Sequence, residues 1–280
     1  MEGANVGAAK TRPGRSKVSP RELAFRIAVP LLGACAMVAF WAVYVWQSEA
    51  PPYILPGPNV VIATIISDLP TLGLALWVTT KTTLLALLCA VIGGGSIALL
   101  LAQARWIEAL FYPVTVTLQV TPIVAIAPLI LIYLPTPQTA QLICAFVVAF
   151  FPIMLNTLQG LKSVERHYAD LLRTYGASRW QAIRYLRIPS ALPHFFSGLK
   201  ISGGLALVGA VVGEFSVGQA GDNAGLAFRL LEAQSRLNTP RVFATLILLA
   251  VLGAVIFAAT SFLSWLALRH WHESEITPKV

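Results

Sequence analysis

Six long apolar segments alternate with short polar ones along the chain. They cover approximately residues 27–46, 77–102, 107–133, 140–159, 194–215 and 242–268. A helix crosses the roughly 30 Å hydrocarbon core of a bilayer with about 20 predominantly apolar residues. Each segment reaches that length, and a helix satisfies its own backbone polar groups in lipid. The pattern predicts an all-α integral membrane protein with six transmembrane helices, in one domain from residue 23 to residue 280.

The third and fifth segments carry residues that change how helices bend and pack. Pro113, Pro122 and Pro128 interrupt the third, and such prolines leave carbonyl groups unpaired and kink a helix. This helix either lines a polar path or is a kinked packing helix, and the pattern does not separate the two. In the fifth, Gly209 and Gly213 are four residues apart, which predicts close contact with a neighbouring helix.

Three polar stretches lie outside the spans, one before the first and two between spans. Residues 1–22 are rich in Gly, Ala, Ser, Pro and basic residues, so we expect a disordered tail. Prolines break the chain between residues 51 and 58, and a short amphipathic helix is predicted near residues 60–69. A second is predicted at residues 226–235, between the last two spans.

The longest internal polar stretch, residues 162–193, has its own helical pattern. Apolar residues recur at helical spacing at Val164, Tyr168, Leu171, Leu172 and Tyr175. Gly176 stands where a helix commonly closes with a left-handed residue. Ser178, followed three residues later by Gln181, is a capping-box pattern that predicts a second helix. We expect Pro189 and Pro193 to end that helix, because proline lacks a backbone donor.

This 162–193 loop has three interpretations from local physics. It is a solvated basic loop of a membrane protein, a DNA-reading helix-turn-helix, or a docking element for a soluble partner. The second is the weakest, because the apolar segments on both sides would hold the loop against a bilayer. The first and third remain open on these grounds.

Composition and charge support the membrane assignment. Hydrophobic residues make up 57% of the 280 residues and charged residues 11%, against about 25% charged in soluble proteins. The three cysteines lie in apolar segments without a CxxC pair, so a metal site is not expected. Of the 20 lysines and arginines, only Lys81, Arg229, Arg236 and Arg241 fall outside if both termini are cytoplasmic. The positive-inside rule therefore places the 162–193 loop in the cytoplasm.

The order of residues in that loop resembles a known signature. Asp170, Leu171 and Leu172, then Gly176 six residues after the aspartate, then Ile188-Pro189, is similar to the cytoplasmic loop of ABC-importer permeases. Aspartate replaces the usual glutamate, and two leucines replace alanines. Further likenesses extend over roughly residues 55–270, at 55–58, 151–157, 176–180 and 209–214. Together they resemble the nitrate/taurine/sulfonate-type permease family, a bacterial inner-membrane group.

The resemblance implies a six-helix type I importer permease, which is not itself an enzyme. It implies two separate ATPase subunits that use ATP and Mg²⁺, an extracytoplasmic substrate-binding protein, and a permease dimer, most simply a homodimer. No cofactor is expected in this chain: residues 93–96 are Gly-Gly-Gly-Ser, but no Gly-Lys-Ser/Thr of a phosphate loop follows. The implied ATPase-coupling residues are Asp170, Leu171, Leu172, Gly176, Ala177, Ser178, Trp180, Ile188 and Pro189.

The transport pathway and its cargo are less specified. The resemblance suggests the third to fifth spans, which gives Thr117, Thr121, Ser202 and Glu214 as candidates, each against an ordinary role in interhelical hydrogen bonding. Lys81 is either an interfacial anchor or a pathway charge. The family's cargoes range from nitrate, sulfonates and taurine to heterocycles such as pyrimidines and flavins.

Two other classes compete with the importer. A self-sufficient secondary transporter would need coupling carboxylates near the bilayer midplane, and Glu214 lies at the end of a span instead. A membrane-embedded enzyme would need a cluster of catalytic or metal-ligating side chains, and no such spacing is found in the sequence.

Overall fold

The computed structural model describes residues 20–218 and 220–269, and all regular structure in these ranges is helical. The chain divides into two compact units, residues 1–51 and 52–280. The first contains α1 (Pro20–Ser48), whose segment Leu32–Ser48 is apolar. The prediction that residues 1–22 are disordered is wrong for residues 20–22, which belong to α1. Residues 1–19 of that tail lie outside the described residues.

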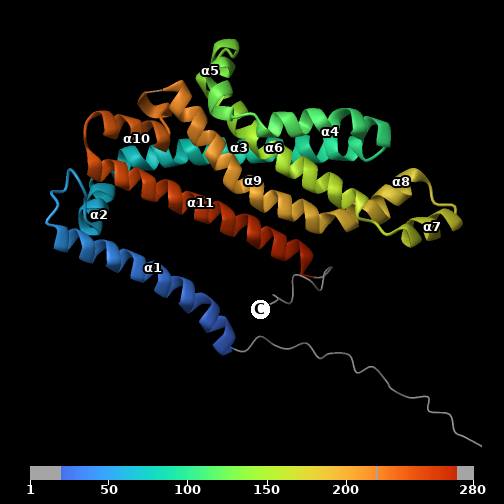
Figure 1. The fold of residues 1–280 in the computed structure, drawn as a ribbon, viewed down its shortest axis with the longest axis horizontal. Helices are drawn as coiled ribbons and strands as arrows, with labels where there is room; N and C mark the ends of the chain where they lie inside the picture. The colour runs from blue at the N-terminus through green and yellow to red at the C-terminus, as the bar shows by residue number, and fades with distance from the viewer. Residues whose placement is uncertain (1–19, 219, 270–280) are drawn as a thin grey trace, which may run out of the picture. The chain divides into compact units, whose positions relative to one another are not determined.

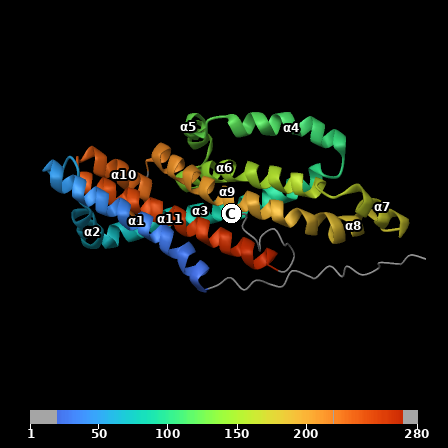
Figure 2. The same ribbon diagram turned by 60° about the horizontal axis from the view of Figure 1, so that its bottom comes forward.

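Three long helices form the centre of the second unit (Figures 1 and 2): α3 (Leu69–Leu101), α6 (Pro137–Lys162) and α9 (Ile188–Val217). They pack on one another, and α11 (Thr239–Leu268) packs along α9. These helices are apolar around most of their circumference, because one side faces the bundle and the other faces outward.

Glycines bring α6 and α9 into close contact. A Cβ at Gly209 would lie 2.7 Å from the Ala145 Cα, and a Cβ at Gly213 would lie 2.9 Å from the Gln141 Cα. Real Cβ atoms do not approach so closely, so only glycine permits this separation. The close helix contact predicted from the four-residue glycine spacing is confirmed.

Within the described residues, four helical segments are long and apolar enough to cross a membrane: Leu69–Leu101, Pro137–Lys162, Arg179–Ser216 and Thr239–Leu268. A fifth span exists if α4 (Arg105–Val120) and α5 (Ile123–Tyr133) count as one. The predicted third span is broken rather than merely kinked, because these two helices meet at an angle of 98°, as in a broken span or a re-entrant loop. Thr121 and Pro122 both adopt extended backbone between them, as a residue before proline tends to do. Pro113 and Pro128 stay inside helices.

Short helices occupy opposite ends of this bundle (Figures 1 and 2). At one end lie α2 (Pro58–Ser67) and α10 (Leu226–Ser235), which both pack against α11. The helix predicted at residues 226–235 is confirmed, whereas the helix predicted near residues 60–69 begins at Pro58 and is apolar rather than amphipathic. At the other end, α7 (Arg166–Thr174) and α8 (Arg179–Ala182) project from the bundle. The 162–193 loop is therefore at the opposite end of α9 from α10.

Candidate functional site

Helix α7 presents apolar side chains to solvent. None of its residues is buried, and Tyr168, Leu171 and the following Tyr175 are all exposed. Asp170 lies 3.5 Å from Arg173, an exposed pair that contributes little to stability. A helix that leaves its apolar stripe uncovered has a surface suited to a partner.

The turn after α7 is fixed by its backbone. Gly176 has φ 71°, in the left-handed region that glycine adopts at low cost. The Gly176 N–H donates to the Arg173 carbonyl at 2.9 Å, and the Ala177 N–H donates to the Leu172 carbonyl at 3.0 Å. This pair of bonds is the Schellman motif, and it confirms the predicted left-handed closure.

The next helix, α8, begins with the predicted capping box. The Ser178 N–H donates to Gln181 Oε1 at 2.7 Å, and the Gln181 N–H donates to Ser178 Oγ at 3.3 Å. Trp180 follows with 69% of its surface exposed. The turn and the cap together hold Trp180 and the α7 side chains in a defined relation.

The expected stop at Pro189 and Pro193 is wrong. A π-helical segment, Ile183–Arg187, joins α8 directly to α9, and the Ile188 N–H donates to the Ile183 carbonyl across it. Pro189 is the second residue of α9 and Pro193 lies further inside it, and neither ends the helix, because the π segment shifts the hydrogen-bond register directly before Pro189. The segment Arg179–Ser216 is therefore a continuous helical rod from the loop into the bundle.

Two polar contacts join residues of the 162–193 loop to α3 and α4. Arg187 Nη1 donates to the Ala102 carbonyl at 3.3 Å, at the C-terminus of α3, where a cation is favourable. Lys162 forms an ion pair with Glu108 of α4. Sequence reasoning missed both contacts; the only signal, for the Lys162–Glu108 pair, was opposite charge near the ends of predicted spans.

The four pathway candidates do not form one site. Thr121 donates to the Thr117 carbonyl at 2.7 Å, and Thr117 donates to the Pro113 carbonyl at 2.9 Å. Thr121 lines a cavity of about 320 Å³ between the α4–α5 break and α6. Ser202 is buried instead and donates to the Ala149 carbonyl at 2.7 Å, across the α6–α9 contact.

Glu214 is fully buried near the end of α9. Its carboxyl group accepts from Thr79 Oγ1 at 2.7 Å and from the Ala227 N–H at 2.8 Å. The Leu226 N–H donates to Thr79 Oγ1 at 2.9 Å. Acidic groups are favourable at a helix N-terminus, and here Glu214 joins α9 and α3 to the first turn of α10.

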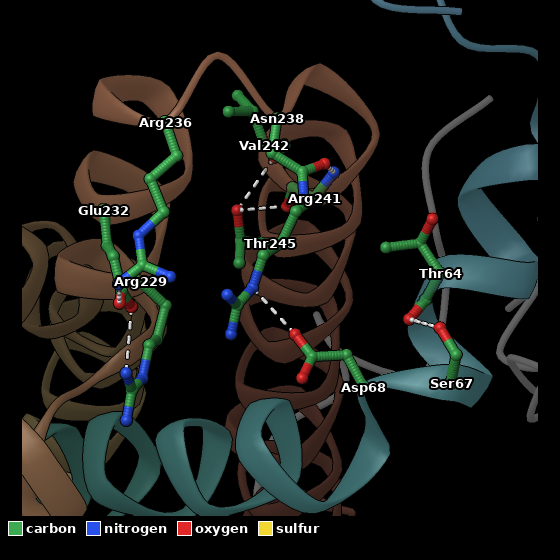
Figure 3. A network of polar contacts seen from close by, with 10 residues as sticks. All are labelled: Thr64, Ser67, Asp68, Arg229, Glu232, Arg236, Asn238, Arg241, Val242 and Thr245. Carbon is green, nitrogen blue, oxygen red and sulfur yellow. Dashed lines mark hydrogen bonds and ion pairs between the residues drawn. The ribbon is translucent and has the colours of Figure 1, made fainter.

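Charged residues cluster around α10 and the start of α11 (Figure 3). Arg241 lies 2.7 Å from Asp68, and Glu232 contacts Arg229 at 2.9 Å and Arg236 at 2.8 Å. The hydrogen bond from Arg229, assisted by the nearby positive charges, lowers the pKa of Glu232. The three arginines assigned to the outside by sequence are thus each paired with a carboxylate.

Comparison with known proteins places these features in a family. The model of the binding-protein-dependent transport system inner membrane component matches residues 90–267. The riboflavin transport system permease of Chloroflexus aurantiacus is 34% identical over 92% of this chain and 97% of its own length. The formylaminopyrimidine transport permease of Halalkalibacterium halodurans is 33% identical over 77% of this chain and 86% of its own. Further relatives are named for aliphatic sulfonates, taurine and bicarbonate, which confirms the resemblance drawn from the sequence.

The fold is shared with a solved transporter. A chain of an amino acid ABC transporter, crystallised with histidines, superposes with a TM-score of 0.60. It is 20% identical and covers 74% of this chain and 97% of its own. This likeness confirms the importer-permease fold.

Proposed function

Because this chain belongs to the binding-protein-dependent transport system inner membrane component family, and is thus the permease subunit of an ABC importer, we propose that its 162–193 loop docks on a separate ATPase subunit. The observation that carries this proposal is the exposed apolar surface of the loop, continuous through α8 and the π segment with α9. Movement of the loop would then be transmitted along one helix into the bundle.

In this proposal the coupling residues have separate tasks. Leu171, Leu172 and Trp180 supply apolar contact with the ATPase, and Asp170 supplies an acidic one. Gly176, Ala177 and Ser178 set the angle between the two short helices through the bonds described above. Ile188 and Pro189 lie at the start of α9, where movement of the loop enters the membrane span.

The remaining subunits follow from the same machinery. Two ATPases bind ATP and Mg²⁺ and close on each other, drawing together the loops of two copies of this chain, which opens the opposite side of the membrane. A binding protein delivers solute at the end that carries α2 and α10. Both termini and the 162–193 loop are cytoplasmic, since this orientation agrees with the distribution of Lys and Arg.

We further propose that the cargo is a heterocyclic solute of the riboflavin or pyrimidine kind. The two relatives at about one-third identity are named for such compounds, and their similarity extends over most of both chains. A small sulfonate, taurine or nitrate is the second candidate, since other relatives carry those names.

Transport in proteoliposomes tests both proposals. Vesicles carrying this chain with its ATPase and binding protein should take up labelled riboflavin or formylaminopyrimidine only with ATP. Saturating uptake of taurine alone would overturn the cargo assignment but not the importer. Uphill uptake by this chain without any ATPase would overturn the coupling itself.

A further inference from the structure

A cavity of about 430 Å³ lies between α3, the first turns of α6 and η2 (Gly221–Asn223). It is at the end of the bundle opposite the 162–193 loop and is separate from the α4–α5 break. One part of its lining is apolar, with Leu74, Trp77 and Leu85 from α3. Another part is polar, with Lys81 and Gln141. A cavity with these two parts matches an amphiphilic ligand.

Two polar groups in this cavity have no partner among the residues that the structure describes. Lys81 is exposed and forms no ion pair with any residue that the structure describes. Gln141 is only 2% exposed, yet its side-chain amide makes no hydrogen bond to any described residue. The Gln141 amide is not among the fully buried groups that lack a partner, so it is accessible from the cavity that it lines, and a ligand there can accept a hydrogen bond from it. The cation beside it selects for negative charge.

The position of Lys81 along α3 indicates where this ligand comes from. Residues 82–101, the rest of the helix, contain no charged side chain. These residues span about 30 Å at 1.5 Å per residue, which is the thickness of the hydrocarbon core. Lys81 thus lies at the membrane boundary, at the depth of lipid headgroups. Exposed Trp77 lies one turn away, as interfacial tryptophans do.

We propose that this cavity binds the headgroup of an anionic phospholipid. Lys81 pairs with the phosphate, the Gln141 amide donates a hydrogen bond to a headgroup oxygen, and one acyl chain runs past Leu85 toward the centre of the membrane, while Leu74 and Trp77 contact the rest of the headgroup region. The bound lipid contacts α3 two residues from Thr79, which joins α3 to α10. The site is therefore distinct from any cargo pathway at Thr121.

Native mass spectrometry of the purified full-length chain, released from nanodiscs containing equal phosphatidylglycerol and phosphatidylcholine, tests this site. Wild type should retain phosphatidylglycerol preferentially. Lys81→Ala should weaken retention roughly five- to tenfold, the effect of about one interfacial charge. Lys81→Arg should restore it, and Gln141→Leu should weaken it by a similar factor. Arg269→Ala is the matched control. It removes a cation at the C-terminal end of α11, away from the cavity, and should leave phosphatidylglycerol retention unchanged.

Three results would overturn the proposal. One is equal retention of both lipids by wild type, and another is unchanged phosphatidylglycerol retention in Lys81→Ala. The third is displacement of the lipid by inorganic phosphate at the same concentration, with the same dependence on Lys81. That result would assign the site to a soluble anion.

Discussion

Thr79 of α3 donates a hydrogen bond of 2.7 Å to Glu214 of α9, although 135 positions separate them in the sequence. Both side chains are fully buried, and the Thr79 hydroxyl also accepts the Leu226 N–H. The backbone of Gly225 lies so close to Glu214 that any Cβ there would overlap the carboxyl group. The acidic residue at the end of the fifth span is thus part of a sealed junction between three helices.

Removal of the Glu214 side chain should destabilise this junction. In Glu214→Ala, the Ala227 N–H and the Thr79 hydroxyl lose their acceptor, at about 1–3 kcal/mol for each buried group. We expect the thermal unfolding midpoint of the purified chain to fall by several degrees. Gly225→Ala should also destabilise the chain, whereas Gly73→Ala, whose Cβ would meet nothing within 4 Å, should not. Equal midpoints for the two glycine variants would contradict the sealed junction.

The turn at Gly176 gives a test of coupling that leaves the bundle intact. Proline requires φ near −65° and cannot adopt the observed 71°. Gly176→Pro should therefore abolish stimulation of the partner ATPase and uptake while membrane insertion stays normal. Gly176→Asn is the matched control, because asparagine tolerates the left-handed region, and it should retain most uptake. ATP-coupled uptake by the proline variant would refute the assigned role of the loop.

The loop also shows how far local sequence rules extend. The glycine closure and the Ser178–Gln181 cap depend on residues three to five positions apart, so the sequence alone predicted them. The continuation past Pro189 was not predictable by those rules. It depends on a π-helical segment that shifts the hydrogen-bond register directly before Pro189.

Long-range pairings could not be predicted for a different reason. The close contact of Gly209 with Ala145 was expected as a contact, but the sequence did not identify its partner helix. The partners of Glu214 lie on α3 and α10, and proximity on that scale depends on the packing of whole helices. The 98° break at Pro122 likewise exceeds the kink that a proline alone produces.

The lowered pKa of Glu232, on α10, predicts that the stability of the chain depends on pH. Arg229 holds the pKa of Glu232 below its ordinary value of 4.5, so the ionised form is favoured by folding. The stabilisation is complete above pH 4.5 and is lost as pH falls through the lowered native pKa. Glu232→Gln should unfold on the order of 2–4 °C below wild type at neutral pH, and the difference should vanish in acid. Thermal unfolding between pH 7 and pH 3 measures this.

The same experiment with Arg229→Gln separates the ion pair from other effects. In the Arg229→Gln background, Glu232→Gln should lower the thermal unfolding midpoint by less at neutral pH, because the main cause of the lowered pKa of Glu232 has been removed. If the difference in unfolding midpoint between Glu232→Gln and wild type grew in acid, the ion pair would not be its cause.

Two glycines on α9 provide a matched test of how tightly the bundle is packed. A Cβ at Gly209 would lie 2.7 Å from the Ala145 Cα, and backbone on α6 cannot move aside as a flexible side chain can. Gly209→Ala should therefore separate α6 from α9, at about 1–3 kcal/mol for overpacking. At Gly204, on the same helix, a Cβ would meet nothing within 4 Å, so Gly204→Ala should be neutral or stabilise by up to about 1 kcal/mol. Thermal unfolding and ATP-coupled uptake of the two variants should diverge. Equal behaviour would mean that α6 and α9 do not hold this separation in the membrane.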